Sequence, residues 1–347
     1  MGPTPADSGR LGDRIDGIVA EEGLTGVVRV DLDGTVVHQR AYGLAHRGLG
    51  IPNAIDTQFG VASGSKTFTA LAVMSLVEHG DLTLDTTARS ILGDDLPLID
   101  DSVTVEQLLS HRSGIGDYLD EDEVHDWNDY LMTVPVHELA TTEQFLRVLD
   151  GYPMKHEPGE RFVYCNGGFV VLALIAERAS GVLYHDLIEQ RVCAPAGMVD
   201  TAFLRSDELP GRAALGYLED VGLRTNVFHL PVRGNGDGGA YTTAADCHAL
   251  WDAFFDGRIV SPETVADMVR PRSHVPEDSM GYGLGFWLYE STGAVSMHGF
   301  DTGACFVSAR VPDGRFTYTV LCNKGRGAWP VSQRLAELLA SSTSTSP

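Results

Sequence analysis

Two groups of β-rich segments at opposite ends of the chain, with a helical stretch between them, constrain the fold more than any other feature. Near the N-terminus, residues 27–30 and 36–42 flank Asp33-Gly34, a dipeptide that favours a type I′ turn. The last quarter of the chain has the same character. Its β-rich segments are residues 283–289, 294–297, 304–311 and 316–321. The pattern therefore predicts one antiparallel sheet built from both chain ends.

Helical periodicity dominates the middle of the chain, beginning just after Ser63 and running to Gly80. Helices are also predicted at residues 11–19, 105–109, 143–149, 169–179, 244–255, 262–268 and 331–339. We expect an α/β (α+β) fold in which helices flank the sheet and a mostly helical domain is inserted. The predicted units are a sheet domain (10–80 and 276–342), a helical domain (81–275) and disordered tails (1–9 and 343–347).

Composition and charge exclude several classes of protein. Hydrophobic residues make up 43% of the 347 residues and charged residues 21%, as in ordinary globular proteins. The 48 acidic and 25 basic residues give a net charge of −23, which repels nucleic acid and anionic membranes. The sequence as given has no secretion signal pattern and no run of 18 apolar residues. We therefore expect a cytoplasmic protein with neither nucleic acid nor a membrane as partner.

Cysteine and histidine spacing argues against disulfides and metal sites. The five cysteines are odd in number and form no Cys-x-x-Cys pattern, so we expect reduced thiols. The twelve histidines include no His-Glu-x-x-His pattern. The acidic run from Asp120 to Glu123 is interpreted as a solvated loop, and no metal or organic cofactor is expected.

Ser63 and Lys66 form a Ser-x-x-Lys pattern at the predicted start of a helix. A spacing of three residues places both side chains on one helix face. A serine hydroxyl is a weak nucleophile until a neighbouring base takes its proton, which a neutral lysine amine can do. Only three of the 25 basic residues are lysines, and arginine could not act as such a base. The pattern also arises by chance, so an ordinary capped helix explains this segment alone equally well.

Further segments occur in an order that points to one family. Tyr164-Cys165-Asn166 matches a Tyr-x-Asn motif, and His298-Gly299-Phe300 stands where a Lys-Thr-Gly or His-x-Gly strand motif belongs. Other matching segments are residues 108–114, 195–201, 238–243 and 282–285. Over residues 11–340 the chain resembles the serine β-lactamase-like superfamily, which includes class C β-lactamases, D-alanyl-D-alanine carboxypeptidases, D-aminopeptidases and carboxylesterases of β-lactamase fold.

The resemblance implies a β-lactamase/transpeptidase-like fold and specific roles for the matching residues. Ser63 would attack an acyl carbonyl, with Lys66 and Tyr164 sharing general-base and general-acid duty. Asn166 would hold Lys66 and a substrate amide. The strand segment of His298, Gly299 and Asp301 would bind substrate, and the backbone N–H groups of Ser63 and Asp301 would form an oxyanion hole.

Three departures from the family pattern bear on specificity. Cys165 replaces a usual serine and places a thiol beside the site. Phe300 stands where the strand motif has glycine, a residue that allows close approach to a ligand. His298 replaces the lysine of true β-lactamases and weakens the charge that attracts a substrate carboxylate. Phe300 and His298 together favour esterase or acyl-transfer activity over β-lactamase and carboxypeptidase activity.

The predicted function is a serine hydrolase that cleaves a small ester or amide through a covalent acyl-Ser63 intermediate. One alternative is an intracellular acyltransferase of natural-product metabolism, because the cell-wall substrates of many family members lie outside the cytoplasm. A β-lactamase or D,D-peptidase is a second alternative. A catalytically silent binding module of the same fold is a third, and only Phe300 supports it.

Overall fold

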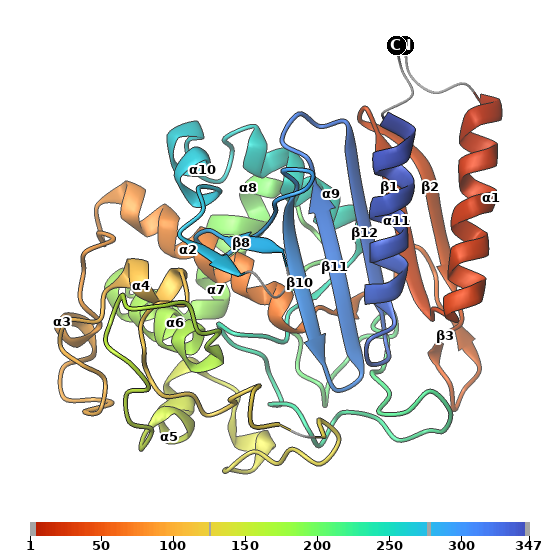
Figure 1. The fold of residues 1–347 in the computed structure, drawn as a ribbon. Coiled ribbons are helices and arrows are strands. Elements are labelled where there is room, and N and C mark those ends of the chain that lie inside the picture. The colour runs from red at the N-terminus through yellow and green to blue at the C-terminus, as the bar shows by residue number, and fades with distance from the viewer. Residues whose placement is uncertain (1–4, 125, 276–278, 344–347) are drawn as a thin grey trace.

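The computed structural model describes residues 5–124, 126–275 and 279–343. Its main feature is an eight-stranded antiparallel sheet in the order β2-β1-β12-β11-β10-β9-β8-β7 (Figure 1). The strands are β1 (Gly26–Leu32), β2 (Thr35–Tyr42), β7 (Ser273–Val275), β8 (Met280–Tyr282), β9 (Trp287–Tyr289), β10 (Val295–Asp301), β11 (Ala304–Arg310) and β12 (Phe316–Cys322). Strand β1 pairs with both β2 and β12, so the prediction of one sheet from both chain ends is confirmed.

Local sequence explains the first hairpin. Asp33 and Gly34 have φ values of 47° and 72°, and a type I′ turn requires positive φ at both central residues. The turn continues the right-handed twist of β1 and β2, which pair from Gly26 with Tyr42 to Leu32 with Thr35. The predicted turn is confirmed.

Helices cover both faces of the sheet. Helices α1 (Pro5–Glu22) and α11 (Ala328–Thr343) pack on one face, as Figure 1 shows. On the other face, α9 (Ala244–Phe255) is bound to the sheet by buried polar contacts. Trp251 Nε1 donates to Ser308 Oγ over 2.8 Å, and His248 Nδ1 lies 2.9 Å from an Asp31 oxygen.

The remaining α-helices are α2 (Ser65–His79), α3 (Ala88–Leu92), α4 (Val105–Leu109), α5 (Leu146–Leu149), α6 (Asn166–Ser180), α7 (Tyr184–Ile188), α8 (Ala194–Ala196) and α10 (Pro262–Met268). Helices α4, α9 and α10 have the predicted bounds, because capping residues fix where they begin. The Ser261 hydroxyl, for example, accepts the N–H of Thr264 over 3.2 Å at the start of α10.

Some predicted elements differ from the structure. Residues 283–289 do not form one strand, because Gly285 has a left-handed φ of 81° and the chain turns there between β8 and β9. Residues 5–9 and Thr343 are helical rather than disordered, while residues 1–4 and 344–347 lie outside the described residues. Short strands such as β5 (Phe59–Gly60) and β6 (Tyr241–Thr242) were not predicted.

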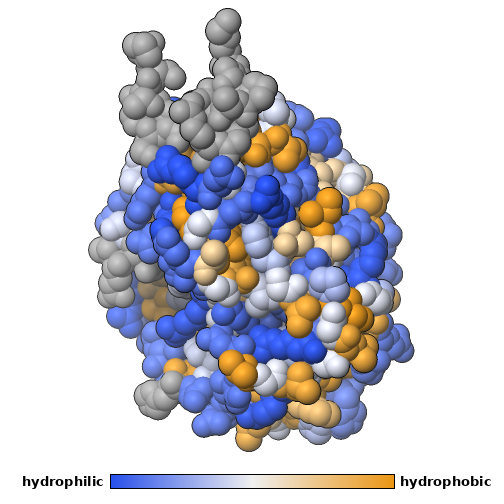
Figure 2. All heavy atoms as spheres, turned by 90° about the vertical axis from the view of Figure 1, so that its right-hand side faces the viewer, coloured by the Kyte–Doolittle hydropathy of each residue, from blue (hydrophilic) through white to orange (hydrophobic). Residues whose placement is uncertain are grey.

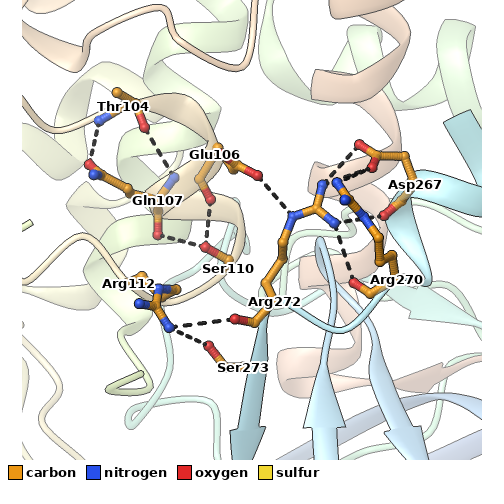
Figure 3. Close-up of polar contacts among 9 residues, drawn as sticks. All are labelled: Thr104, Glu106, Gln107, Ser110, Arg112, Asp267, Arg270, Arg272 and Ser273. Atoms are coloured by element: carbon orange, nitrogen blue, oxygen red, sulfur yellow. Dashed lines mark hydrogen bonds and ion pairs between the residues drawn. The ribbon is translucent and has the colours of Figure 1, made fainter. Parts of the chain in front are cut away.

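The division into a sheet domain and a helical domain stays a prediction, but its boundary at 275/276 does not follow the sheet. Strand β7 and helix α9 lie within 81–275 and belong to the sheet and to its cover. Close to β7, the partly buried guanidinium of Arg272 binds Glu106 of α4 over 2.8 Å and Asp267 of α10 over 2.9 Å (Figure 3). These contacts fix the helical part against the sheet edge.

Surface and helix composition add two observations. Among the described helices, none is by itself long and apolar enough to cross a membrane, although the bent pair of α6 with residues 184–196 would pass by length and composition alone.

Figure 2, which views the side where α1 lies, shows apolar residues as scattered spots between hydrophilic areas. The described residues on that face therefore form no large apolar patch in this view.

Candidate active site

Ser63 lies on a strained turn between β5 and α2. The turn is a short helix, η1 (Ala62–Gly64), and Ala62 has a φ of 46°, which a side-chain-bearing residue adopts only at a cost of about 1–3 kcal/mol. Every residue from Val61 to Leu76 is buried except Ser63. The turn thus holds one hydroxyl out of the core, at the wall of a cavity that Ser63 lines.

Lys66 lies on the first turn of α2, and its amine contacts three oxygen atoms. Its Nζ lies 3.0 Å from Ser63 Oγ, 2.7 Å from Asn166 Oδ1 and 2.7 Å from the carbonyl oxygen of Asp237. The side chain is buried, and burial lowers the pKa of the amine although Asp237 and other nearby carboxylates oppose that fall. The structure therefore brings together the predicted serine, lysine and asparagine.

Tyr164 lies in the extended segment just before α6, with its ring beside the amine. Lys66 Nζ is 4.9 Å from the ring centroid, and the ring of Trp287 stacks on Tyr164 with centroids 6.1 Å apart. Burial raises the pKa of the phenol well above its usual value, although interaction with the Ser63 hydroxyl opposes the rise. Tyr164 is consequently a neutral phenol near neutral pH, close to both Ser63 and Lys66.

The start of α6 orients Asn166. The N–H groups of Asn166 and Gly167 donate to the two carboxylate oxygens of Asp117 over 2.5 and 2.8 Å. Burial raises the pKa of Asp117 to about 6 despite these bonds. Asn166 Nδ2 donates to the carbonyl of Leu119 and to a Glu121 oxygen, which leaves Oδ1 for Lys66.

Cys165 has a structural role at the same helix. Its sulfur accepts the N–H of Gly168 over 3.3 Å, and its own N–H donates to His111 Nδ1 over 3.1 Å. The thiol is buried, and burial raises its pKa well above the usual value. An easily oxidised thiol therefore does not fit this environment.

Strand β10 meets the Ser63 turn at Gly299. A Cβ atom at Gly299 would lie 1.9 Å from the carbonyl oxygen of Val61 and 2.8 Å from the N of Gly64. Gly299 therefore makes the close approach that requires glycine. The family pattern had placed this glycine at position 300, where the chain has Phe300. Since alternate residues of a strand share a face, Asp301 is on the same side as Gly299 and lines the cavity.

This register also changes the predicted oxyanion donor. Asp301 pairs with Ala304 across the two-residue turn that joins β10 to β11. The facing residues of such a turn exchange their N–H···O=C bonds, so the N–H of Asp301 is directed at β11. Because successive N–H groups of a strand point to opposite edges, the N–H of Phe300 points to the edge of β10 that faces away from β11. The predicted donor is therefore displaced by one residue, from Asp301 to Phe300.

The structure does not bring His298 to the cavity. Its Nε2 atom lies 3.2 Å from the Tyr289 hydroxyl and 3.1 Å from Ser296 Oγ. Its ring stacks on Trp287 with centroids 5.8 Å apart, so Trp287 separates it from Tyr164. Burial lowers the pKa of His298 to about 4, which makes the imidazole neutral. The predicted role of His298 in substrate binding is thus not supported.

Sequence reasoning missed the acidic character of the cavity. The glycine-rich segment 234–239 lies at the site, since Lys66 Nζ donates to the carbonyl of Asp237. Glu121, Asp237 and Asp301 all line the cavity, but only Asp301 was a predicted site residue. Glu121 was assigned to a solvated loop, and its exposure agrees with that assignment. No signal in the sequence links these three positions.

Comparison with known proteins places the chain in a family. A family model described as "Beta-lactamase" matches residues 11–341. The chain belongs to the β-lactamase family. It is 36% identical to a penicillin-binding protein from Bacillus halodurans, whose crystal structure superposes with a TM-score of 0.88 over 93% of this chain and 99% of that one. The fold predicted from the resemblance is confirmed.

Two curated relatives indicate the range of activities in the family. Esterase EstB of Burkholderia gladioli is 30% identical and aligns over 81% of this chain and 79% of its own. Penicillin-binding protein 4* of Bacillus subtilis is 29% identical and aligns over 86% of this chain and 68% of its own. These relatives establish a serine hydrolase family whose members differ in substrate.

Proposed function

We propose that this protein is a serine hydrolase that cleaves a small ester or amide through a covalent acyl-Ser63 intermediate. The observation that carries the proposal is the set of contacts around Lys66. A neutral amine has two N–H bonds and one lone pair. The carbonyl of Asp237 and Oδ1 of Asn166 would accept the two N–H bonds, which leaves the lone pair for the Ser63 hydroxyl.

Acylation would begin when Ser63 Oγ attacks the substrate carbonyl while its proton moves to Lys66. The lowered pKa of Lys66 favours the neutral amine that this step needs. The carbonyl oxygen would gain negative charge and accept hydrogen bonds from the N–H groups of Ser63 and Phe300. The direction of the Phe300 N–H in β10 is the basis for its part in this role.

Tyr164 would deliver a proton to the leaving group. Its neutral phenol lies beside Lys66, so a proton taken by the amine can be passed on as the carbon–leaving-group bond breaks. Deacylation would reverse these roles, with water in place of the leaving group. Transfer to another acceptor instead of water would use the same steps, and no contact among the described residues of the cavity favours it.

Hydrolysis of carboxylate-bearing β-lactams is the less favoured alternative. If Gly299 is the glycine of the Lys-Thr-Gly pattern, the buried Met297 occupies the position of its lysine. His298 is neutral and engaged elsewhere. Neither residue therefore offers a positive charge for a carboxylate, which supports an esterase or amidase over a β-lactamase.

A covalent probe tests the proposal. We expect a fluorophosphonate to add one mass increment at Ser63 and p-nitrophenyl butyrate to be hydrolysed. Both reactions should be lost in Ser63→Ala and retained in Ser102→Ala, because Ser102 is exposed and far from α2 in the sequence. Labelling confined to another serine, or hydrolysis that survives in Ser63→Ala, would refute the mechanism.

A further inference from the structure

The cavity in front of Ser63 contains more negative charge than the proposed reaction needs. Glu121, Asp237 and Asp301 line it, whereas none of its described lining residues is lysine or arginine. Lys66 is buried, and its amine is already engaged by three oxygen atoms. The excess of carboxylates therefore faces the space that a substrate would occupy.

None of the three carboxylates has an ion-pair partner in the described part of the chain. Each makes a contact with a neutral donor. Asp301 Oδ1 accepts the N–H of Thr302 over 2.7 Å, Asp237 accepts the Tyr118 hydroxyl, and Glu121 accepts Asn166 Nδ2 over 3.1 Å. Elsewhere in this protein, carboxylates of the same kind pair with arginine, as Asp267 does with Arg272.

The carboxylates act on one another across the cavity. Burial raises the pKa of Asp301 to about 7, and the charges of Glu121 and Asp237 add to the rise more than Lys66 opposes it. The charges of Glu121 and Asp237 disfavour a further anion beside them and attract a cation. A positively charged group bound there would relieve the repulsion.

Aromatic side chains complete a surface suited to an organic cation. Trp127, Tyr130 and Phe300 also line the cavity, and the rings of Trp127 and Phe300 meet edge to face at 5.2 Å. Aromatic faces attract ammonium groups, with a contribution of about 0.5–2 kcal/mol. One cation already uses this chemistry, because the Arg326 guanidinium lies 5.4 Å from the ring centroid of Phe300.

A separate observation concerns a polar side chain without a partner at the wall of the cavity. Asn235 lines it and is 1% exposed, and its Oδ1 accepts the N–H of Gly236 over 2.8 Å. Its Nδ2 donor has no partner among the described residues. A buried donor without a partner costs about 1–3 kcal/mol, and a substrate carbonyl oxygen would remove that cost.

We infer that the substrate carries a protonated amine close to the scissile carbonyl, and that Asp301 and Glu121 bind this amine beside Trp127. Amino-acid esters or amides with a free amino group are therefore the preferred substrates. The inference rests on the proposed function and specifies its substrate class. Asp301 directly follows Phe300, whose N–H is the proposed oxyanion donor. The Asp301 carboxylate is therefore one residue along the chain from the group that would bind the substrate carbonyl. A substrate with a carboxylate at this place would meet three carboxyl groups and, among the described lining residues, no lysine or arginine.

Inhibition by three compounds of similar shape tests the inference. Benzylammonium, benzyl alcohol and benzoate would be compared as competitive inhibitors of p-nitrophenyl butyrate hydrolysis at pH 8. We expect the inhibition constant of benzylammonium to be at least about tenfold lower than that of benzyl alcohol, and benzoate to be the weakest. The preference should shrink in 1 M salt, because salt screens charges.

Variants localise the effect. For each variant we would take the ratio of the inhibition constant of benzyl alcohol to that of benzylammonium. This ratio should fall at least about threefold in Asp301→Asn and in Glu121→Gln. The ratio is compared within each variant, so a change in turnover does not affect it. Glu123→Gln is the matched control, since Glu123 is an exposed carboxylate near Glu121 that does not line the cavity. Its ratio should equal that of the parent protein.

Substrates give a second readout. The value of kcat/KM for alanine p-nitroanilide, in either enantiomer, should exceed that for the isobutyryl analogue, in which a methyl group replaces the ammonium. Equal inhibition by all three compounds, or a preference that survives in both Asp301→Asn and Glu121→Gln, would overturn the inference while Ser63-dependent ester hydrolysis still stands. Absence of any Ser63-dependent hydrolysis would instead overturn the proposed function, and calorimetric titration with benzylammonium would then test the cation site alone.

Discussion

The Nζ atom of Lys66 lies 2.7 Å from Oδ1 of Asn166, although 100 positions separate the two residues in the sequence. Asn166 cannot turn away from this contact, because its Nδ2 is bound to Leu119 and Glu121. The carbonyl of Asp237 holds the amine from another side. The geometry thus fixes the direction in which a lone pair on Lys66 would point, which is toward Ser63.

Replacing Lys66 by arginine should abolish acylation without unfolding the protein. Lys66→Arg keeps a positive charge but cannot lose its proton, and loss of a general base lowers rates by on the order of 10²–10⁴. We expect at least about a hundredfold slower acylation of Ser63, measured by stopped-flow mixing with a fluorogenic ester. Circular dichroism should report a folded protein. Lys155→Arg is the control, because Lys155 pairs with Asp120 on the surface and should tolerate the change. Near-parental acylation in Lys66→Arg would leave Tyr164 as the base.

Adding a methyl group at Gly299 should damage the site more than the fold. The new Cβ would lie 1.9 Å from the backbone oxygen of Val61, so β10 or the Ser63 turn must move apart. We expect kcat to fall at least about a hundredfold, because a misplacement near 1 Å can cost that much. Gly17→Ala is the control, since no atom of the described residues lies within 4 Å of its Cβ position in α1, and it should be neutral or slightly stabilising. Parental turnover in Gly299→Ala would show that β10 does not position the reacting groups.

Shortening Phe300 should change which acyl groups fit. Its ring lines the cavity against Trp127, whereas its backbone carries the proposed oxyanion donor, which the substitution keeps. Phe300→Ala should therefore raise kcat/KM for bulky esters relative to p-nitrophenyl acetate by about tenfold. A series of p-nitrophenyl esters of increasing acyl size measures this ratio. An equal effect on all esters would mean that the ring does not limit the cavity.

Cation binding should depend on pH through Asp301. The pKa of this carboxyl is raised to about 7, so the group is charged above that pH and neutral below it. Glu121 and Asp237 face Asp301 and raise its pKa, while Lys66 lowers it. The inhibition constant of benzylammonium should therefore increase severalfold as the pH falls from 8 to 6. The constant of benzyl alcohol should stay level.

The variant Asp301→Asn separates this effect from other titrations. Its benzylammonium constant should vary little between pH 6 and 8, because the group that changes charge is gone. Changes in turnover caused by Lys66 affect both inhibitors alike and cancel in their ratio. A pH dependence that persists unchanged in Asp301→Asn would assign the titration to another group.

Local patterns in the sequence determined a large part of the fold. The Asp33-Gly34 turn follows from the backbone freedom of those residues, and the start of α10 follows from the Ser261 cap. The relation of Ser63 to Lys66 is also local, because a spacing of three on a helix brings two side chains together whatever surrounds them. Tyr164 and Asn166 could be predicted only through the resemblance to a family.

Tertiary structure alone decided which face of β10 meets Ser63 and which charges share the cavity. A shift of one residue turns every side chain of a strand to the other face, and the letters His298-Gly299-Phe300 do not reveal the register. The register depends on how closely β10 packs against the carbonyl of Val61. Glu121, Asp237 and Asp301 come from separate segments, so their mutual repulsion exists only once the chain has folded around the cavity.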